Sequence, residues 1–179
     1  MRNFNQPSRC SSHEACAFRW FGYPAANLKA DVQVALERFI SIVQGDSEKL
    51  NPYILADAKA QFLTRMDLAS TGELKPVSMI KPVDTRNPPP LFEIRWQGIQ
   101  AGRPPENGNA KHAEIPIRMY HSEPESQPGY FIGHHIHEKI VSGLRSPNEL
   151  QNEEIETAKG HYRRGLNSNW GIRSQDPSQ

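Results

Sequence analysis

The chain has 179 residues, of which 36% are hydrophobic and 23% charged, and this length is enough for one domain with a buried core. Most of the 15 prolines lie between residues 76 and 128, which excludes an all-helical protein because proline interrupts helices. The 21 Lys and Arg against 20 Asp and Glu leave a formal net charge of +1, so no strong field attracts nucleic acid from a distance. Any role in nucleic-acid chemistry must therefore rest on a local basic site.

The sequence shows no signal for export or for a membrane. No apolar run approaches the ~20 residues of a membrane span, and residues 1–7 lack the apolar segment of a signal peptide. We therefore expect a cytoplasmic protein. The two cysteines, Cys10 and Cys16, have no second pair that would complete a zinc site or a disulfide framework, so neither structural zinc nor stabilisation by disulfides is implied.

Both ends of the chain are polar and rich in turn-forming residues. Residues 1–13 and 174–179 have little to bury, so we expect two disordered tails around a single folded domain at residues 14–173. Within this domain, the short aromatic-rich segment 14–22 predicts a first strand.

Two segments show the 3.6-residue spacing of an amphipathic helix. Apolar side chains recur from residue 28 to 43 and from residue 55 to 69, and a glycine follows each run. Asn51 followed by Pro52 is typical of a helix start. The short connection predicts an antiparallel helix hairpin, whose apolar side requires a sheet to cover it.

Three later segments, 91–97, 115–121 and 130–139, alternate apolar and polar residues as half-buried strands do. We expect an antiparallel meander with these residues under the helix hairpin: Phe92, Ile94, Trp96, Ile117, Met119, Ile132 and Ile136. Residues 146–149 read as a capping box, and the acidic and then basic residues up to Gly165 predict a last helix. The predicted fold class is α+β, a twisted antiparallel sheet with an N-terminal helix hairpin on one face and a C-terminal helix.

The period of two places the polar side chains of these strands on the other face of the sheet, which we expect to be uncovered. They are Glu93, Arg95, Arg118, Tyr120, His135, His137 and Lys139. Guanidinium and ammonium groups can hold a phosphate and stabilise the charge that develops on it, while a histidine can move a proton near neutral pH. Such a set suits phosphodiester cleavage, which needs no metal if the attacking group is the 2′-hydroxyl of RNA.

Three plainer interpretations stay open. Charged residues on the outer face of a sheet also keep it soluble, and on the pattern alone this interpretation carries more weight. His135 and His137 have the spacing of some metal sites, although no further ligand has an obvious place. The Tyr120 ring can simply pack across the sheet.

The order of these segments and their sequence motifs resemble those of the RelE/ParE toxin superfamily of bacterial type II toxin–antitoxin systems, and within it the phage-derived, HigB-like branch. The resemblance covers residues 14–164. It rests on KPV at 81–83, LFEIR at 91–95, IRMY at 117–120, FIGHHIHEK at 131–139 and EEIETAK at 153–159. It implies a RelE-like fold for the domain at 14–173.

Members with RelE-type activity cleave mRNA on the ribosome by 2′-hydroxyl attack without a metal. The resemblance therefore implies a cytoplasmic mRNA endonuclease toxin whose partners are a cognate antitoxin and ribosome-bound mRNA, with no membrane and no cofactor. Arg95, Arg118 and Lys139 match basic positions of the family, so the resemblance implies that they are catalytic, and we expect His135 or His137 of the same face to move the proton. The expected substrate-binding residues are Tyr120 and Lys81. Glu93 and Glu138 stand where the family has basic residues, and both remove positive charge. The alternative is a non-catalytic protein of the same fold, a gyrase-type inhibitor or a degenerate toxin.

Overall fold

The computed structural model describes residues 7–22, 30–45, 50–75, 79–83, 89–102, 113–140 and 146–172. The predicted tails at 1–6 and 174–179 lie outside these ranges. In chain order the elements are the 3-10 turn η1 (Arg9–Ser11), β1 (Ala17–Trp20), α1 (Asp31–Gln44), α2 (Pro52–Ser70), β2 (Ile80–Val83), β3 (Leu91–Gln100), β4 (Glu114–Ser122), β5 (Tyr130–Glu138), α3 (Pro147–Leu166) and the 3-10 turn η2 (Asn169–Gly171). The α+β class is confirmed.

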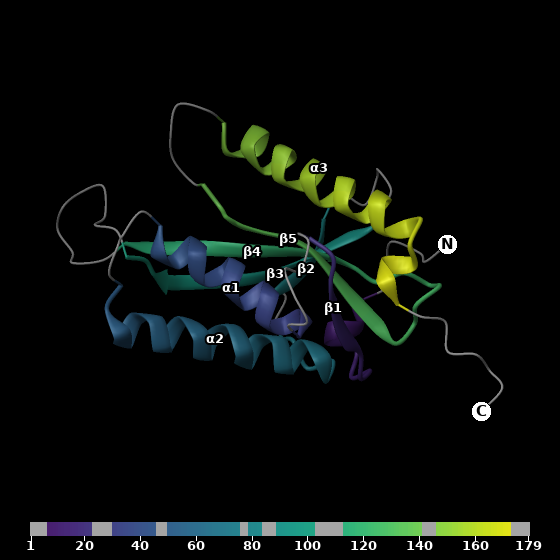
Figure 1. Ribbon diagram of the computed structural model, residues 1–179, viewed down its shortest axis with the longest axis horizontal. Coiled ribbons are helices and arrows are strands. Elements are labelled where there is room, and N and C mark those ends of the chain that lie inside the picture. The colour runs from purple at the N-terminus through teal and green to yellow at the C-terminus, as the bar shows by residue number, and fades with distance from the viewer. Residues whose placement is uncertain are drawn as a thin grey trace.

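The five strands form one sheet in the order β1-β5-β4-β3-β2 (Figure 1). Strands β3, β4 and β5 pair antiparallel, as predicted for the meander, and β2, which was not predicted, pairs antiparallel with β3. Strand β1 pairs with β5 in parallel, so the prediction of a purely antiparallel sheet was wrong at one edge. Parallel neighbours need a long connection, and here the helix hairpin and three strands separate β1 from β5 along the chain.

The α1–α2 hairpin covers one face of the sheet, and α3 lies on the other (Figure 1). On the hairpin side, the Trp96 ring packs against Phe39 of α1 and Phe62 of α2, with ring centroids 5.2 and 5.5 Å away. Aromatic rings of this size bury more apolar area than other side chains, so they anchor the hairpin to the sheet. Five of the residues predicted to lie under the hairpin belong to this core: Ile94, Trp96, Ile117, Met119 and Ile136.

A β-bulge in β5 changes the predicted alternation, because the pairing with β4 skips His134. Phe131 therefore lies in the core on the hairpin side, and its neighbour Ile132 is buried on the opposite face. The prediction for Ile132 was wrong for this reason. Phe92 stays on the hairpin face but stacks on His121, at 5.6 Å between ring centroids, beyond the hairpin itself.

Residues 7–13, which the sequence assigned to a disordered tail, are packed into the fold. Ser8, Arg9 and Cys10 are buried. The Arg9 guanidinium donates hydrogen bonds to three backbone carbonyls between β4 and β5, those of Pro124, Gln127 and Tyr130. The prediction was wrong here because these polar side chains find buried partners more than 100 residues away, which local composition does not show.

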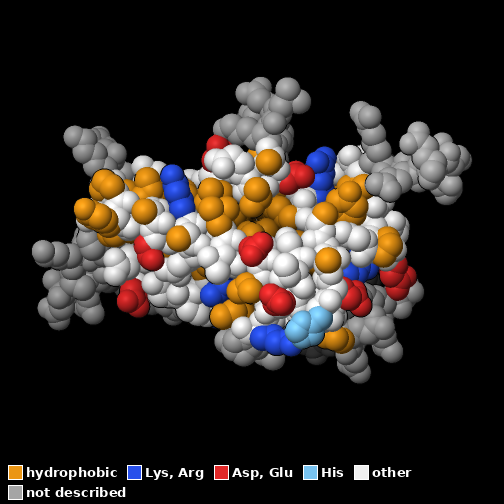
Figure 2. Space-filling model, turned by 90° about the horizontal axis from the view of Figure 1, so that it is seen from below, with side chains coloured by type: hydrophobic (Ala, Val, Ile, Leu, Met, Phe, Trp, Pro, Cys, Tyr) orange, Lys and Arg blue, Asp and Glu red, His pale blue; other side chains and the backbone are white. Residues whose placement is uncertain are grey.

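The outer side of the hairpin is the face seen in Figure 2, where hydrophobic side chains lie between charged ones. Helix α2 exposes Tyr53, with 85% of its surface accessible. Single exposed apolar side chains are ordinary on protein surfaces. None of the described helices is long and apolar enough to cross a membrane.

The start of α2 offers a test of the local structure. The Asn51 side chain accepts a hydrogen bond from the backbone N–H of Tyr53 at 2.9 Å, and Pro52 occupies the first turn as predicted. We expect Asn51→Ala to lower the free energy of unfolding by about 1 kcal/mol, because an N-cap bond is lost. Urea denaturation measures this difference.

Ser146, at the start of α3, is the matched control. Its side chain makes no cap hydrogen bond, so the predicted capping box is absent. We expect Ser146→Ala to change the free energy of unfolding by less than about 0.5 kcal/mol. An equal loss in both variants would contradict the role assigned to Asn51.

Candidate functional site

The structure brings the predicted polar residues of neighbouring strands side by side. Arg95 of β3 stands opposite Arg118 of β4, and Glu93 stands opposite Tyr120. Arg118 in turn faces His137 of β5, and Tyr120 faces His135. Lys81 of the edge strand β2 pairs with Glu93. These residues, together with Lys139 just after β5, form what we call the β3–β5 polar cluster.

This cluster is not on an uncovered face, which corrects the prediction made from the alternation. Helix α3 packs against β4 and β5 on this side (Figure 1), and five members of the cluster are buried: Glu93, Arg118, Tyr120, His135 and His137. Arg95 and Lys139 are partly exposed, and the Lys81 side chain is 42% exposed. A substrate can therefore reach only the rim of the cluster unless α3 moves.

The Glu93 carboxylate is the centre of the basic part of the cluster. The Arg95 Nε donates to its Oε1 at 2.6 Å, the Lys81 Nζ lies 3.6 Å from the same oxygen, and the Arg118 Nε lies 4.0 Å from Oε2. Burial lowers the pKa of Arg118, and the Glu93 carboxylate opposes this shift. One buried carboxylate thus balances part of the charge that three cations would offer to a phosphate.

Three aromatic rings stack next to these charges. The Tyr120 ring lies 5.1 Å from His137, and His137 lies 5.6 Å from His135 with the two imidazoles nearly parallel. This confirms that Tyr120 packs across the sheet. The His135 Nε2 forms a hydrogen bond with the carboxylate of Glu154 of α3, and this bond is the main cause of the lowered pKa of Glu154.

His137 has one nitrogen fixed and one without a partner. Its Nδ1 lies 2.9 Å from the backbone carbonyl of Glu138, to which it donates. Its buried Nε2 has no hydrogen-bond partner among the described residues. Burial is the main cause that lowers the pKa of His137 from 6.5 to about 4. The imidazole is therefore neutral at pH 7, and its Nε2 carries a lone pair that can accept a proton.

A small open pocket lies beside His137, between the end of β5 and the first turns of α3. Its walls are His137, Glu138, Lys139, Ile140, Pro147, Leu150, Gln151 and Glu154. Lys139 supplies a cation there, and its backbone N–H donates to the Pro116 carbonyl at 2.8 Å. The pocket brings together two of the predicted catalytic residues, His137 and Lys139.

Sequence reasoning missed Glu154 as a member of the site, since it counted only the strands. A signal was present, because Glu154 stands four residues before the buried Ala158 and next to the buried Ile155. That spacing places Glu154 on the side of α3 that faces the sheet. An acidic residue on the inward side of a helix predicts a buried partner, and here the partner is His135.

The metal interpretation of His135 and His137 finds no support in this geometry. The ring nitrogens already face different partners, Glu154 and the Glu138 carbonyl. Among the residues that the structure describes, these histidines belong to no group of three metal-ligating side chains.

Two further histidines, His134 of β5 and His161 of α3, have structural contacts. The His134 Nε2 lies 2.8 Å from the Ser122 hydroxyl, and the His161 Nδ1 donates to the His134 backbone carbonyl. Neither lines the pocket beside Lys139. His161 is therefore a suitable control for variants of His137.

The lowered pKa of His137 predicts a pH dependence of stability. The folded chain protonates this imidazole only near pH 4, whereas the unfolded chain protonates it below 6.5. Between these values the unfolded state binds more protons, so stability is lost as the pH falls, by on the order of 1 kcal/mol per pH unit. We expect His137→Gln to reduce the slope of the unfolding free energy against pH by about the contribution of one proton, measured by urea unfolding between pH 7 and pH 4.5. An unchanged slope would contradict the burial of a neutral His137.

Comparisons with protein-family models, with curated proteins and with solved structures found no match for this chain.

Proposed function

We propose that this chain is the toxin of a type II toxin–antitoxin pair, and that it cuts mRNA on the ribosome at the pocket between β5 and α3 without a metal. The observation that carries the proposal is His137. Its Nδ1 is held by a backbone carbonyl, its Nε2 lone pair has no partner among the described residues, and Lys139 lines the same pocket. A fixed neutral imidazole next to a cation is suited to general-base chemistry on a phosphodiester.

The reaction is transfer of the phosphoryl group to the neighbouring 2′-oxygen. His137 Nε2 takes the proton of the 2′-hydroxyl, and the oxygen attacks the adjacent phosphorus. The bond from phosphorus to the 5′-oxygen breaks, and the leaving oxygen takes a proton from solvent. The products are a 2′,3′-cyclic phosphate and a 5′-hydroxyl end, and the Lys139 ammonium stabilises the charge on the phosphoryl oxygens.

The remaining predicted residues act from behind the pocket. Arg95 donates a hydrogen bond to Glu93, and the Arg118 Nε lies 4.0 Å from the Glu93 Oε2. The positive field of both therefore acts on the phosphate at longer range, and His135 is held by its hydrogen bond to Glu154. Lys81 is exposed enough to contact RNA directly, whereas the buried Tyr120 contacts RNA only when the first turns of α3 move aside. The proposal requires this movement, since the His137 Nε2 is also buried.

Two further observations support the proposal. The order of strand, helix hairpin, meander and helix in the structure is the order on which the resemblance to the RelE/ParE superfamily rests. The net charge of +1 favours a substrate presented by the ribosome over free RNA, because affinity for free RNA depends on the number of cations engaged. In this proposal the partners are ribosome-bound mRNA and a cognate antitoxin, in the cytoplasm.

A second candidate is a non-catalytic binding protein of the same fold. The burial of the polar cluster under α3 and the pairing of Glu93 with three cations favour it. In that case the cluster stabilises the packing of α3, and no phosphodiester bond is cut.

Inducible expression in bacteria, with and without a neighbouring antitoxin gene, distinguishes the two candidates. We expect growth arrest with new 5′-hydroxyl ends in cellular messages, and rescue by the antitoxin. Lys139→Ala should reduce the cleavage at least about tenfold, because a cation on the transferring phosphoryl group is lost. Lys59→Ala, on the exposed side of α2, should cleave as the wild type does. Growth arrest with intact messages would overturn the endonuclease and favour the binding protein.

A further inference from the structure

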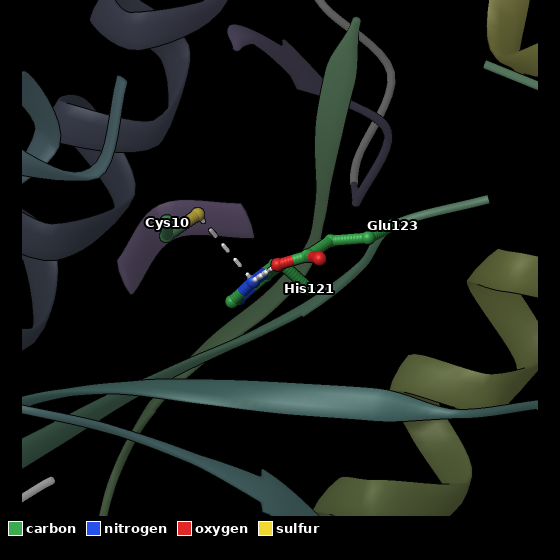
Figure 3. Close-up of side chains that lie close together, drawn as sticks. All are labelled: Cys10, His121 and Glu123. Atoms are coloured by element: carbon green, nitrogen blue, oxygen red, sulfur yellow. Dashed lines mark hydrogen bonds and ion pairs between the residues drawn. The ribbon is translucent and has the colours of Figure 1, made fainter. Parts of the chain in front are cut away.

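A second cluster of reactive side chains lies on the opposite face of the sheet from the His137 pocket. It consists of Cys10 from η1, His121 from the end of β4 and Glu123 just after it (Figure 3). All three side chains are buried, and one donor atom from each lies within 4.8 Å of the other two. A thiol, an imidazole and a carboxylate in this arrangement are the donor types that bind zinc in proteins.

The separations fit a shared ion. The Cys10 Sγ lies 3.8 Å from the His121 Nε2, and the same nitrogen lies 3.2 Å from the Glu123 Oε1 (Figure 3). Bond lengths to zinc of about 2.3 Å for sulfur and about 2.0–2.1 Å for nitrogen and oxygen, at tetrahedral angles, give edges of about 3.6 and 3.3 Å. Both observed edges lie within a few tenths of an ångström of these values.

The arrangement differs from a nucleophile activated by a histidine. In such a set the thiol and the carboxylate contact different nitrogens of the imidazole. Here both contact Nε2, and the buried Nδ1 has no partner in the described part of the chain. One N–H cannot point at both neighbours, whereas one cation between the three atoms satisfies all of them.

The surroundings hold the three side chains in place. The Glu123 carboxylate accepts hydrogen bonds from the Ser8 hydroxyl and, at 2.9 Å, from the backbone N–H of Arg9. The His121 ring lies between Phe92 and Phe131, with both centroids at 5.6 Å. Contacts of this kind orient the ligands of metal sites.

We propose that Cys10, His121 and Glu123 bind one zinc ion, which fastens the N-terminal segment to β4. Thiolate and imidazole donors disfavour magnesium and calcium, which bind through oxygen. All three ligands are buried, and Cys10 is more than 100 residues away from the other two along the chain. The ion therefore has a structural role. It joins the segment before β1 to the turn between β4 and β5.

The full chain, purified without a metal-binding tag, tests this site. We expect about one zinc per chain by elemental analysis. After exchange of the zinc for cobalt, we expect a thiolate-to-cobalt charge-transfer band and the visible bands of tetrahedral cobalt. Removal of the metal by a chelator should lower the melting temperature by several degrees, and added zinc should restore it, because an ion that binds only the folded state stabilises it.

Variants separate the site from incidental binding. Cys10→Ala should abolish the charge-transfer band, and Glu123→Gln should weaken zinc binding at least about tenfold. His161→Gln is the matched control, since this buried imidazole donates to the His134 backbone carbonyl and lies outside the cluster; it should keep the zinc. The wild-type cobalt spectrum remains decisive if Cys10→Ala fails to fold. Two results would overturn the proposal. One is less than about one tenth of a zinc ion per chain together with no cobalt bands, and the other is an equal zinc content in Cys10→Ala and wild type.

Discussion

Replacing His137 with glutamine is expected to lower RNA cleavage at least about 100-fold, the contribution that a positioned general base makes. Glutamine keeps a polar side chain of similar length but cannot take a proton from a 2′-hydroxyl. The Nδ1 contact to the Glu138 carbonyl can be replaced by the amide, so the fold should be retained. The measurement is the rate of cutting of ribosome-bound mRNA, with circular dichroism as the check on folding.

His161→Gln is the control for this variant. His161 is also a buried histidine, on the inner side of α3, and its Nδ1 donates to the His134 carbonyl, but it does not line the pocket. It should cut at close to the wild-type rate. Equal losses of cutting rate in the two variants would show that both histidines serve the packing of α3 against the sheet, and would exclude His137 as the base.

Glu93→Gln is expected to lower the free energy of unfolding by about 3 kcal/mol or more, because it leaves the buried Arg118 without its carboxylate. Arg95 and Lys81 lose the same partner, but both are partly exposed and can be hydrated. Denaturation in urea at pH 7 measures the loss. Less than about 1 kcal/mol would contradict the central role given to this carboxylate.

Two further variants sharpen this test. Replacing both partners by methionine, Glu93→Met with Arg118→Met, should cost less than Glu93→Gln alone, because no unpaired buried charge remains. Asp57→Asn is the surface control. Its carboxylate accepts from Gln61 at 2.8 Å on the exposed side of α2, and its loss should change stability by less than about 0.5 kcal/mol.

The elements with a strong local pattern could be predicted from the sequence. The hairpin helices α1 and α2 followed from apolar residues at helical spacing, and Asn51 and Pro52 mark the start of α2 as expected. The antiparallel pairing of β3 and β4 was expected for a meander, and alternation placed Trp96 in the core and Arg118 on the opposite face. In both cases the period of the side chains carries the information.

The structure differs from the sequence-based predictions where segments that are far apart in the sequence meet. The parallel pairing of β1 with β5, and the cover that α3 gives to the polar face, depend on contacts that no local period encodes. The bulge at His134 inserts one residue into a strand whose two halves each alternate normally. Strand β2, at residues 80–83, has no alternation of its own and contains a proline, so it was not predicted.

The candidate sites divide in the same way. The alternation of the strands predicted that Arg95, Arg118 and His137 share one face of the sheet. The contact between Glu154 and His135 could not be predicted in this way, because it depends on the position of α3. The Cys10 cluster was out of reach of local reasoning, because its members lie 111 residues apart in the sequence and Cys10 stood in a predicted tail.

The most direct test of the account is cleavage of a ribosome-bound mRNA that carries a single 2′-deoxynucleotide at the cut site. The account predicts that the wild-type chain cuts the all-ribose message, leaves a 2′,3′-cyclic phosphate, and does not cut the message that lacks this one hydroxyl. Cutting of the 2′-deoxy message at the same position would show that the attacking group is not the 2′-hydroxyl. No cutting of either message by a chain that still arrests growth would show that the chain is not an endonuclease.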